Sequence, residues 1–254
     1  MCSSDLRILL FAKRNTKEVL RDPINFFFGL GFPLVLLMLL SIINASIPPE
    51  ANNTMFAIEN LAPGLAMFGT VFMALFAGML LSKDRTSSFL MRLFTSPMTS
   101  KDFIIGYTLP LLAMTAPQAA ITFLAASLWG LEISVSLLPA IVVTTITSLL
   151  YIGLGLLAGS LMNDKAVGGV CGALLTNVAG WLSGVFIPLD LIGGVFKKAA
   201  DILPFYHSVE AIRTVLGGNF SDSLPHLLVV LAYTVAVFVL AVIAFQSKMS
   251  GDKA

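Results

Sequence analysis

Long apolar segments constrain the fold of this chain more than any other feature. A helix needs about 20 apolar residues to cross the hydrocarbon core of a bilayer. Six segments meet that requirement, at residues 25–43, 61–81, 99–130, 137–162, 167–188 and 224–246. Only 11% of the residues are charged, against about 25% in soluble globular chains. Backbone groups in lipid must bond within their own segment, so each span should be helical. The sequence predicts an all-α integral membrane protein with six transmembrane helices, residues 1–254 forming a single transmembrane domain.

The segment 4–22, which precedes the first span, has a different character. At about 100° per residue, its five basic residues fall on one arc of a helix, with apolar residues on the remaining surface. These basic residues are Arg7, Lys13, Arg14, Lys17 and Arg21. The pattern predicts an amphipathic helix in the membrane interface, ending at Pro23. A solvated helix that merely precedes a span is the alternative.

The basic residues also predict the orientation of the spans. With six spans, both termini lie on one side of the membrane. That side collects 12 of the 15 Lys and Arg residues and half of the 14 acids, which leaves it with a charge of +5 against −4 on the other side. Because cytoplasmic loops are enriched in Lys and Arg, we expect both termini in the cytoplasm.

The longest polar interruption on the cytoplasmic side is residues 82–107, SKDRTSSFLMRLFTSPMTSKDFIIGY. Its middle, residues 89–94, is apolar and basic, which a simple connection would not need. We expect a short helix at residues 86–95. Thr99 followed by Asp102 is typical of a helix cap and predicts the start of the third span.

The connection between the fifth and sixth spans, residues 189–223, is not loop-like in composition. It holds two short apolar-periodic pieces broken at Pro204, the second closed by Gly217 and Gly218. A pair of re-entrant half-helices in the outer leaflet fits this pattern, and two helices lying flat outside are the alternative. The polar or conformationally special residues singled out here are Pro204, Tyr206, His207, Glu210 and Arg213, of which Glu210 and Arg213 can pair at i,i+3.

Several kinds of chemistry are missing from the sequence. No Gly is followed by Lys, so the phosphate-binding loop of nucleotide hydrolases is absent. The predicted spans carry no buried acid or base, which argues against an ion-coupled carrier. His207 and His226 suggest no third ligand, so no metal site is expected. The glycine run that starts at Gly168 is better explained by close helix packing than by nucleotide binding.

The polar residues inside the predicted spans are few and uncharged. Gln118, Thr122 and Asn177 could hydrogen-bond between helices, or they could line a weakly polar translocation path. Adaptable Met and aromatic side chains, of which the chain has 11 Met and 19 Phe, would suit a lipophilic substrate.

Three stretches together resemble the membrane subunit of the ABC type-2 permease family. Residues 20–23, LRDP, are similar to the end of that family's amphipathic elbow helix. RLFTSPMTSKDFIIGY, ending at Tyr107, resembles the stretch between its second and third spans, and LPFYHSVEAIRTVLGG resembles its signature before the last span. One departure is Lys83-Asp84-Arg85, where many relatives have a Glu-Arg pair.

This resemblance implies an export permease without enzymatic activity of its own, in the plasma membrane of a bacterium. Two permease chains, identical or paralogous, would form the path, and two ATPase subunits would bind ATP and Mg and drive it. No cofactor on this chain and no nucleic-acid partner are expected. The loop after the second span would act as a coupling helix. The residues expected to contact the ATPase are Lys83, Arg85, Phe89, Leu90, Arg92, Leu93, Phe94, Lys101, Asp102, Asp164 and Lys165.

The substrate class stays open at this stage. A drug, an antimicrobial peptide or a lipid-like molecule fits the resemblance, because the apolar spans favour a lipophilic or amphipathic molecule. A lipid-linked polysaccharide is an alternative substrate. A carrier or assembly scaffold that works without an ATPase is an alternative function.

Overall fold

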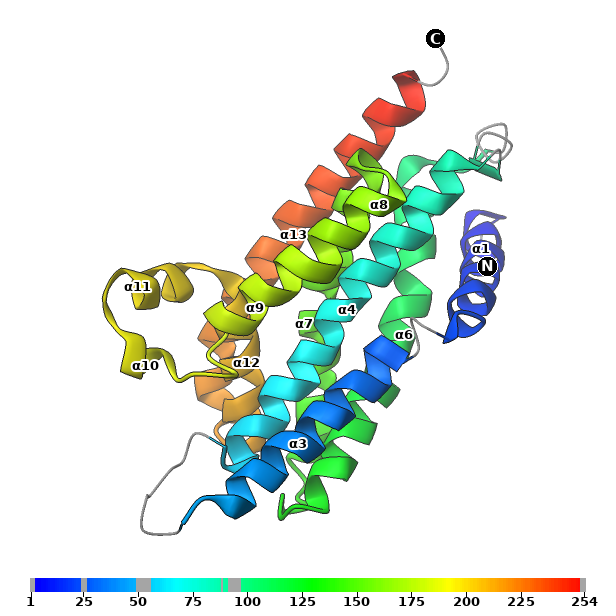
Figure 1. The fold of residues 1–254 in the computed structure, drawn as a ribbon. Helices are drawn as coiled ribbons and strands as arrows, with labels where there is room; N and C mark the ends of the chain where they lie inside the picture. The colour runs from blue at the N-terminus through cyan, green and yellow to red at the C-terminus, as the bar shows by residue number, and fades with distance from the viewer. Residues whose placement is uncertain (1–2, 24–26, 49–55, 88, 91–96, 252–254) are drawn as a thin grey trace.

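A computed structural model describes residues 3–23, 27–48, 56–87, 89–90 and 97–251 (Figure 1). Every regular element in these ranges is a helix, which confirms the all-α class. The elements are α1 Ser3–Leu20, η1 Phe27–Gly31, α3 Phe32–Ser46, α4 Ile58–Thr86, α6 Ser100–Ser127, α7 Leu137–Leu161, α8 Asp164–Val167, η3 Gly168–Leu175, α9 Thr176–Leu182, α10 Leu189–Ile192, α11 Gly194–Ile202, α12 Pro204–Leu216 and α13 Phe220–Gly251.

Five of the described helices are long and apolar enough to cross a membrane. They are Phe27–Ser46, Ile58–Thr86, Ser100–Ser127, Leu137–Leu161 and Phe220–Lys248. The segment 167–188, predicted as another span, is divided among α8, the π-helix η3 and α9, and its helical part ends at Leu182. The structure therefore gives five helices that are long and apolar enough to span, where the sequence predicts six.

Two helices run well past their predicted ends. The second predicted span, 61–81, lies inside α4, and the sixth, 224–246, lies inside α13. Helix α4 continues through its charged end because Asp84 and Arg85 both bind other parts of the chain, as described below. The start of α6 is as predicted: Asp102 N–H donates to Thr99 Oγ1, and Thr99 N–H donates to Asp102 Oδ2 at 2.8 Å. This helix continues through Pro110 and Pro117.

The core of the bundle lies where α4 crosses α7. Helix α4 is buried along nearly its whole length. A Cβ at Gly155 of α7 would lie 2.0 Å from the carbonyl oxygen of Ala74, and one at Gly159 would lie 2.5 Å from that of Gly78. The two backbones are thus in direct contact, as small residues permit between membrane helices. By contrast, a Cβ at Gly168 or Gly169 would meet nothing within 4 Å, whereas one at Gly172 would lie 3.5 Å from Leu75, so the glycine run that starts at Gly168 packs closely only at its end.

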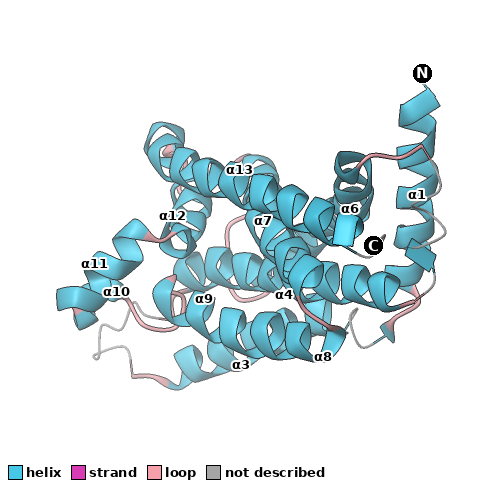
Figure 2. Cartoon of the chain, turned by 90° about the horizontal axis from the view of Figure 1, so that it is seen from above, coloured by secondary structure: helices cyan, strands magenta, loops and turns pink. Residues whose placement is uncertain are grey.

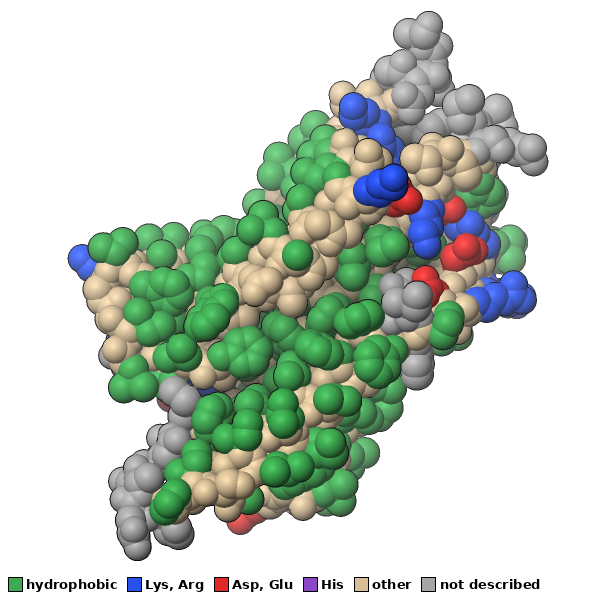
Figure 3. Space-filling model, viewed as in Figure 1, with side chains coloured by type: hydrophobic (Ala, Val, Ile, Leu, Met, Phe, Trp, Pro, Cys, Tyr) green, Lys and Arg blue, Asp and Glu red, His purple; other side chains and the backbone are tan. Residues whose placement is uncertain are grey.

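Helix α1 lies across the long helices rather than along them (Figure 2). It covers part of α6 with Phe11, Ala12 and Val19, which are buried, and it leaves Leu9 and Leu10 exposed. Lys and Arg side chains gather at the end of the molecule where α1, α8 and the last turns of α4 lie, while the flank of the bundle is hydrophobic (Figure 3). Charge is therefore concentrated at the end that the sequence analysis assigned to the cytoplasm.

The segment before α13 forms short helices, as the sequence predicted. Pro204 begins α12, and the chain leaves that helix through Gly218, whose φ of 84° is in the left-handed region that glycine favours. Val209 and Ile212 of α12 are buried against the bundle. Helices α10 and α11 project from it (Figure 1).

Candidate functional site

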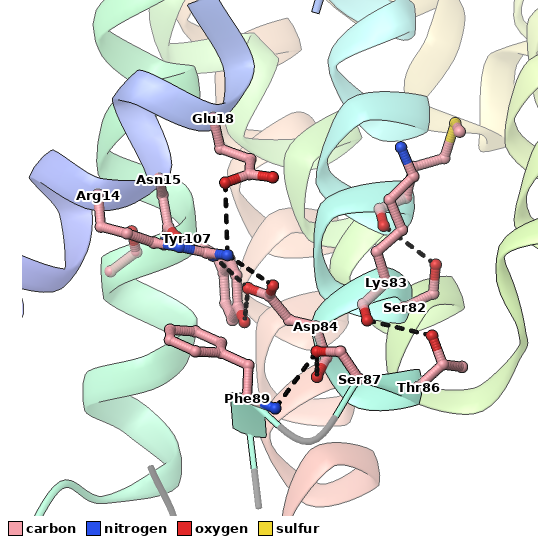
Figure 4. A network of polar contacts seen from close by, with 12 residues as sticks. Arg14, Asn15, Glu18, Ser82, Lys83, Asp84, Thr86, Ser87, Phe89 and Tyr107 are labelled. Atoms are coloured by element: carbon pink, nitrogen blue, oxygen red, sulfur yellow. Dashed lines mark hydrogen bonds and ion pairs between the residues drawn. The ribbon is translucent and has the colours of Figure 1, made fainter. Parts of the chain in front are cut away.

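A carboxylate is buried where the last turn of α4 meets α1 and α6 (Figure 4). The side chain of Asp84 is 7% exposed. Its Oδ1 accepts a hydrogen bond from Nη2 of Arg14 at 2.9 Å, and its Oδ2 accepts from Nη1 of Arg14 at 2.5 Å. The hydroxyl of Tyr107 donates to Oδ2 at 2.8 Å. The arrangement is a two-point ion pair with a third donor, which is the geometry a buried carboxylate requires. We call Arg14, Asp84 and Tyr107 the junction.

The junction holds three elements together. Arg14 comes from the crosswise α1, Asp84 from α4 and Tyr107 from α6. Beside it, Asn15 is fully buried and its Nδ2 donates to the carbonyl oxygen of Gly106 at 3.0 Å. Phe11 packs edge-on against Tyr107, with ring centroids 4.9 Å apart. A displacement of α1 must therefore move α4 and α6 or break buried polar contacts.

The guanidinium of Arg14 is the centre of charge at the junction. Burial alone would lower the pKa of Arg14. The hydrogen bond to Asp84 and the negative charge of that carboxylate together outweigh burial, so the pKa of Arg14 is raised. Glu18 lies 3.4 Å from Nη2 of Arg14, and the ring of Phe89 lies 4.2 Å from its central carbon. Phe89 lies in the connection that leads from α4 to α6. Arg14 therefore also links α1 to that connection, through a cation–π contact.

Two further arginines bind backbone carbonyls at this end of the molecule. Nη1 of Arg85 donates to the carbonyl oxygen of Gly159 at 2.7 Å, near the end of α7. The last carbonyls of a helix have no partner within the helix and favour a cation. Nη1 of Arg7 donates to the carbonyl oxygen of Pro97 at 3.2 Å, just before α6.

The residues expected to contact an ATPase have different surroundings. Lys83, Lys101, Asp164 and Lys165 are exposed at the basic end. Leu90 is 1% exposed within the core of this chain, so it is not available to a partner as the sequence led us to expect. Arg92, Leu93 and Phe94 lie outside the described residues, as does most of the predicted helix at 86–95. Thr86 itself belongs to α4.

The basic residues of α1 do not form one solvated stripe. Lys13, Lys17 and Arg21 are exposed, whereas Arg14 is turned into the junction. The interfacial pattern of the sequence therefore contains two residues that bind within the chain, Arg14 at the junction and Arg7 at Pro97.

The predicted path residues are brought together only in part. Gln118 and Thr122 are buried on α6, and Nε2 of Gln118 lies 3.4 Å from both the hydroxyl of Thr122 and the carbonyl oxygen of Ala66. Oε1 of Gln118 has no hydrogen-bond partner in the described part of the chain. Asn177 is exposed on α9 and donates to the carbonyl oxygen of Ala173 in its own helix.

The segment before α13 contains two polar pairs. Arg213 donates to Glu210 across one turn of α12, as predicted. The Nδ1 atoms of His207 and His226 are 2.7 Å apart, and Nε2 of His207 is 2.8 Å from the carbonyl oxygen of Asp201. Tyr206 lies beside both imidazole rings. Among the described residues, no group of three or more His, Cys, Asp and Glu side chains could hold a metal ion.

Sequence reasoning missed Asp84, Asn15 and Tyr107. It placed Asp84 beyond the predicted span 61–81, whereas α4 extends to Thr86 and buries this acid in its last turn. One signal was available: Asp84 is an acid near the C-terminal end of a long apolar helix, where the helix dipole disfavours negative charge. A carboxylate placed there needs a cationic partner, and α1 supplies it.

Comparison with known proteins identifies the family of this chain. Residues 7–217 match the family described as ABC-2 type transporter. The chain is also similar to Nodulation protein J of Rhizobium leguminosarum bv. viciae, with 25% identity over 236 residues that cover 91% of this chain and 86% of the relative. The family match spans all of the junction and most of the helices, and the chain belongs to the ABC-2 type transporter family.

Proposed function

We propose that this chain is the membrane subunit of an ATP-driven exporter and that a separate ATPase subunit supplies the energy. The observation that carries the proposal is the junction. It ties a crosswise basic helix, the end of α4 and the start of the loop to α6 into one unit, at the end of the molecule where Lys and Arg gather. A displacement of this end by a partner would be transmitted to the long helices α4 and α6.

The proposed topology has six spans and cytoplasmic termini. The segment α8–η3–α9 serves as the fifth span, because it is apolar and helical without interruption from Asp164 to Leu182. Helix α1 is the interfacial elbow, and α11 and α12 enter the outer leaflet as half-helices. Residues 1–254 then form a single permease domain.

The proposed ATPase contact is formed by exposed charges of α4, α6 and α8. Lys83, Lys101, Asp164 and Lys165 are exposed there and can form ion pairs with a partner, and the loop at residues 91–96 lies between Leu90 and α6 in sequence. Two ATPase subunits, holding ATP and Mg, would act on two permease chains. The second permease is another copy of this chain or a paralogue.

The proposed substrate is lipophilic or amphipathic. The polar groups in the spans are few, and Gln118 offers a carbonyl oxygen that no described group of the chain uses. Gln118 and Thr122 together form a small polar patch on α6 that could face a substrate at one step of transport. Asn177 would belong to the path only if α9 faces it in the assembled transporter.

Co-expression with a candidate ATPase tests the proposal. The purified chain alone should hydrolyse no ATP, and it should co-purify with the ATPase and stimulate export in vesicles. Phe94→Asp should weaken the complex, while Lys198→Glu, at the projecting α11, should leave it intact. Full transport in vesicles without any ATPase would overturn the proposal in favour of an independent carrier.

A further inference from the structure

A charged cavity lies between the end of α1 and the last turns of α4. It has a volume of about 320 Å³. Its polar wall carries both signs of charge, from Arg21, Lys83, Glu18 and Asp22, and its apolar wall includes Phe76 and Leu80. In the described structure the side chains of Arg21 and Lys83 are exposed and form no ion pair with the chain. The cavity thus carries two basic and two acidic side chains, and neither base forms an ion pair in the described part of the chain.

A second cavity continues along α4, away from the charged end. It has a volume of about 250 Å³ and an almost wholly apolar lining that includes Met73, Ala113 and Met114. Phe76 lines both cavities. From Lys83 to Met73, α4 rises roughly 15 Å at 1.5 Å per residue. That length equals half of the ~30 Å hydrocarbon core, the share of one leaflet.

The two cavities together have the polarity of a membrane lipid. A charged compartment at the level of the basic end and an apolar compartment meet at Phe76, and together they extend along α4 by about the depth of one leaflet. Two bases and two acids line the charged part, so a head group that carries both charges complements it better than a purely anionic one does. Lys and Arg bind phosphate through charge-assisted hydrogen bonds, and an ammonium group can donate to Glu18 and Asp22.

We propose that these cavities hold one zwitterionic phospholipid of the inner leaflet. Its phosphate lies between Arg21 and Lys83, its ammonium group faces Glu18 and Asp22, and one acyl chain follows α4 past Phe76 to Met114. Since Glu18 also pairs with Arg14, the lipid head would adjoin the junction and support the crosswise position of α1. This site is separate from transport, and its place in the inner leaflet rests on the proposed topology.

The test measures the lipids retained by the full-length chain. The protein is extracted from membranes of phosphatidylethanolamine and phosphatidylglycerol in equal amounts, washed in detergent and analysed by native mass spectrometry. We expect about one phosphatidylethanolamine per chain, enriched over phosphatidylglycerol. Arg21→Gln combined with Lys83→Gln should lower retention of both lipids about tenfold, the effect of losing a charged hydrogen bond. Asp22→Asn should reduce the preference for phosphatidylethanolamine.

Matched controls separate this site from general lipid contact. Lys13→Gln and Lys17→Gln remove exposed charges from the same helix outside the cavity and should leave retention unchanged. Ala113→Trp fills the apolar cavity and should lower retention, whereas Leu124→Trp, an exposed position of α6, should not. Retention of phosphatidylglycerol in preference, or equal loss in control and cavity variants, would overturn the proposal. A retained transport substrate in place of phospholipid would overturn it too, and its mass would reveal it.

Discussion

Both carboxylate oxygens of Asp84 accept hydrogen bonds from the guanidinium of Arg14, a residue 70 positions earlier in the chain. This ion pair fixes the crosswise helix α1 to the most deeply buried helix of the bundle. The hydroxyl of Tyr107 provides a third contact from α6. The end of the protein that would receive a partner is therefore held by buried charge rather than by apolar packing alone.

The first prediction concerns how much each residue of the junction contributes to the free energy of unfolding. Arg14→Gln should lower the free energy of unfolding most, by about 3–5 kcal/mol, because it leaves the Asp84 carboxylate buried without a counter-charge. Asp84→Asn should cost less, since the side chain of Arg14 is 32% exposed and can be hydrated. Tyr107→Phe removes one hydrogen bond and should cost about 1–3 kcal/mol. Thermal unfolding in detergent measures all three.

Lys13→Gln is the matched control for the junction, because Lys13 is an exposed base one position from Arg14. It should leave the unfolding temperature unchanged. If Arg14→Gln unfolds at the same temperature as Lys13→Gln, the junction does not hold α1 in place.

The second prediction concerns the contact between α4 and α7. Ala normally stabilises a helix relative to Gly, by about 0.5–1 kcal/mol. At Gly155 the added methyl group would meet the carbonyl oxygen of Ala74 at 2.0 Å, so Gly155→Ala should instead destabilise the protein, by about 1–3 kcal/mol of overpacking. At Gly168 a Cβ meets nothing within 4 Å, and Gly168→Ala should be neutral or stabilising. Equal unfolding temperatures for the two variants would contradict the close crossing.

Much of the fold could be predicted from the sequence because it depends on local signals. Apolar length predicts where the long helices lie, the pairing of Thr99 with Asp102 predicts the start of α6, and Pro204 predicts the break before α12. These features need information from only a few neighbouring residues, or from the average polarity of about 20. They give the helices but not their contacts.

The junction could not be predicted in the same way. Its partners are 70 and 23 residues apart in sequence, and no periodicity connects Arg14 to Asp84. The amphipathic pattern placed Arg14 with four other bases and gave no sign that it enters a buried ion pair with Asp84. The crossing at Gly155 is equally non-local, because the same residue type at Gly168 meets open space. Tertiary contact, not residue type, distinguishes these positions.

The third prediction concerns the two histidines that join α12 to α13. A backbone carbonyl can only accept, so Nε2 of His207 carries the hydrogen that it donates to Asp201. In the neutral ring Nδ1 of His207 then accepts from Nδ1–H of His226, 2.7 Å away. A double-mutant cycle with His207→Phe and His226→Phe should give a coupling of about 1 kcal/mol in the free energy of unfolding. Additive effects would show that the pair does not join the helices.

The fourth prediction concerns the surface that would bind an ATPase. Lys101 in the first turn of α6 and Lys165 in α8 are exposed, and so is Lys198 on the projecting α11. If acidic groups of the ATPase face the basic end, Lys101→Glu and Lys165→Glu should each weaken the complex, because a like charge replaces an opposite one. Lys198→Glu changes the net charge by the same amount and should not. This loss of affinity should become smaller as the salt concentration rises, because salt screens the interaction between exposed charges. The screening length is about 10 Å at 0.1 M salt. Affinity of the purified complex at two salt concentrations measures both effects, and equal weakening by all three substitutions would mean that net charge, not this surface, controls binding.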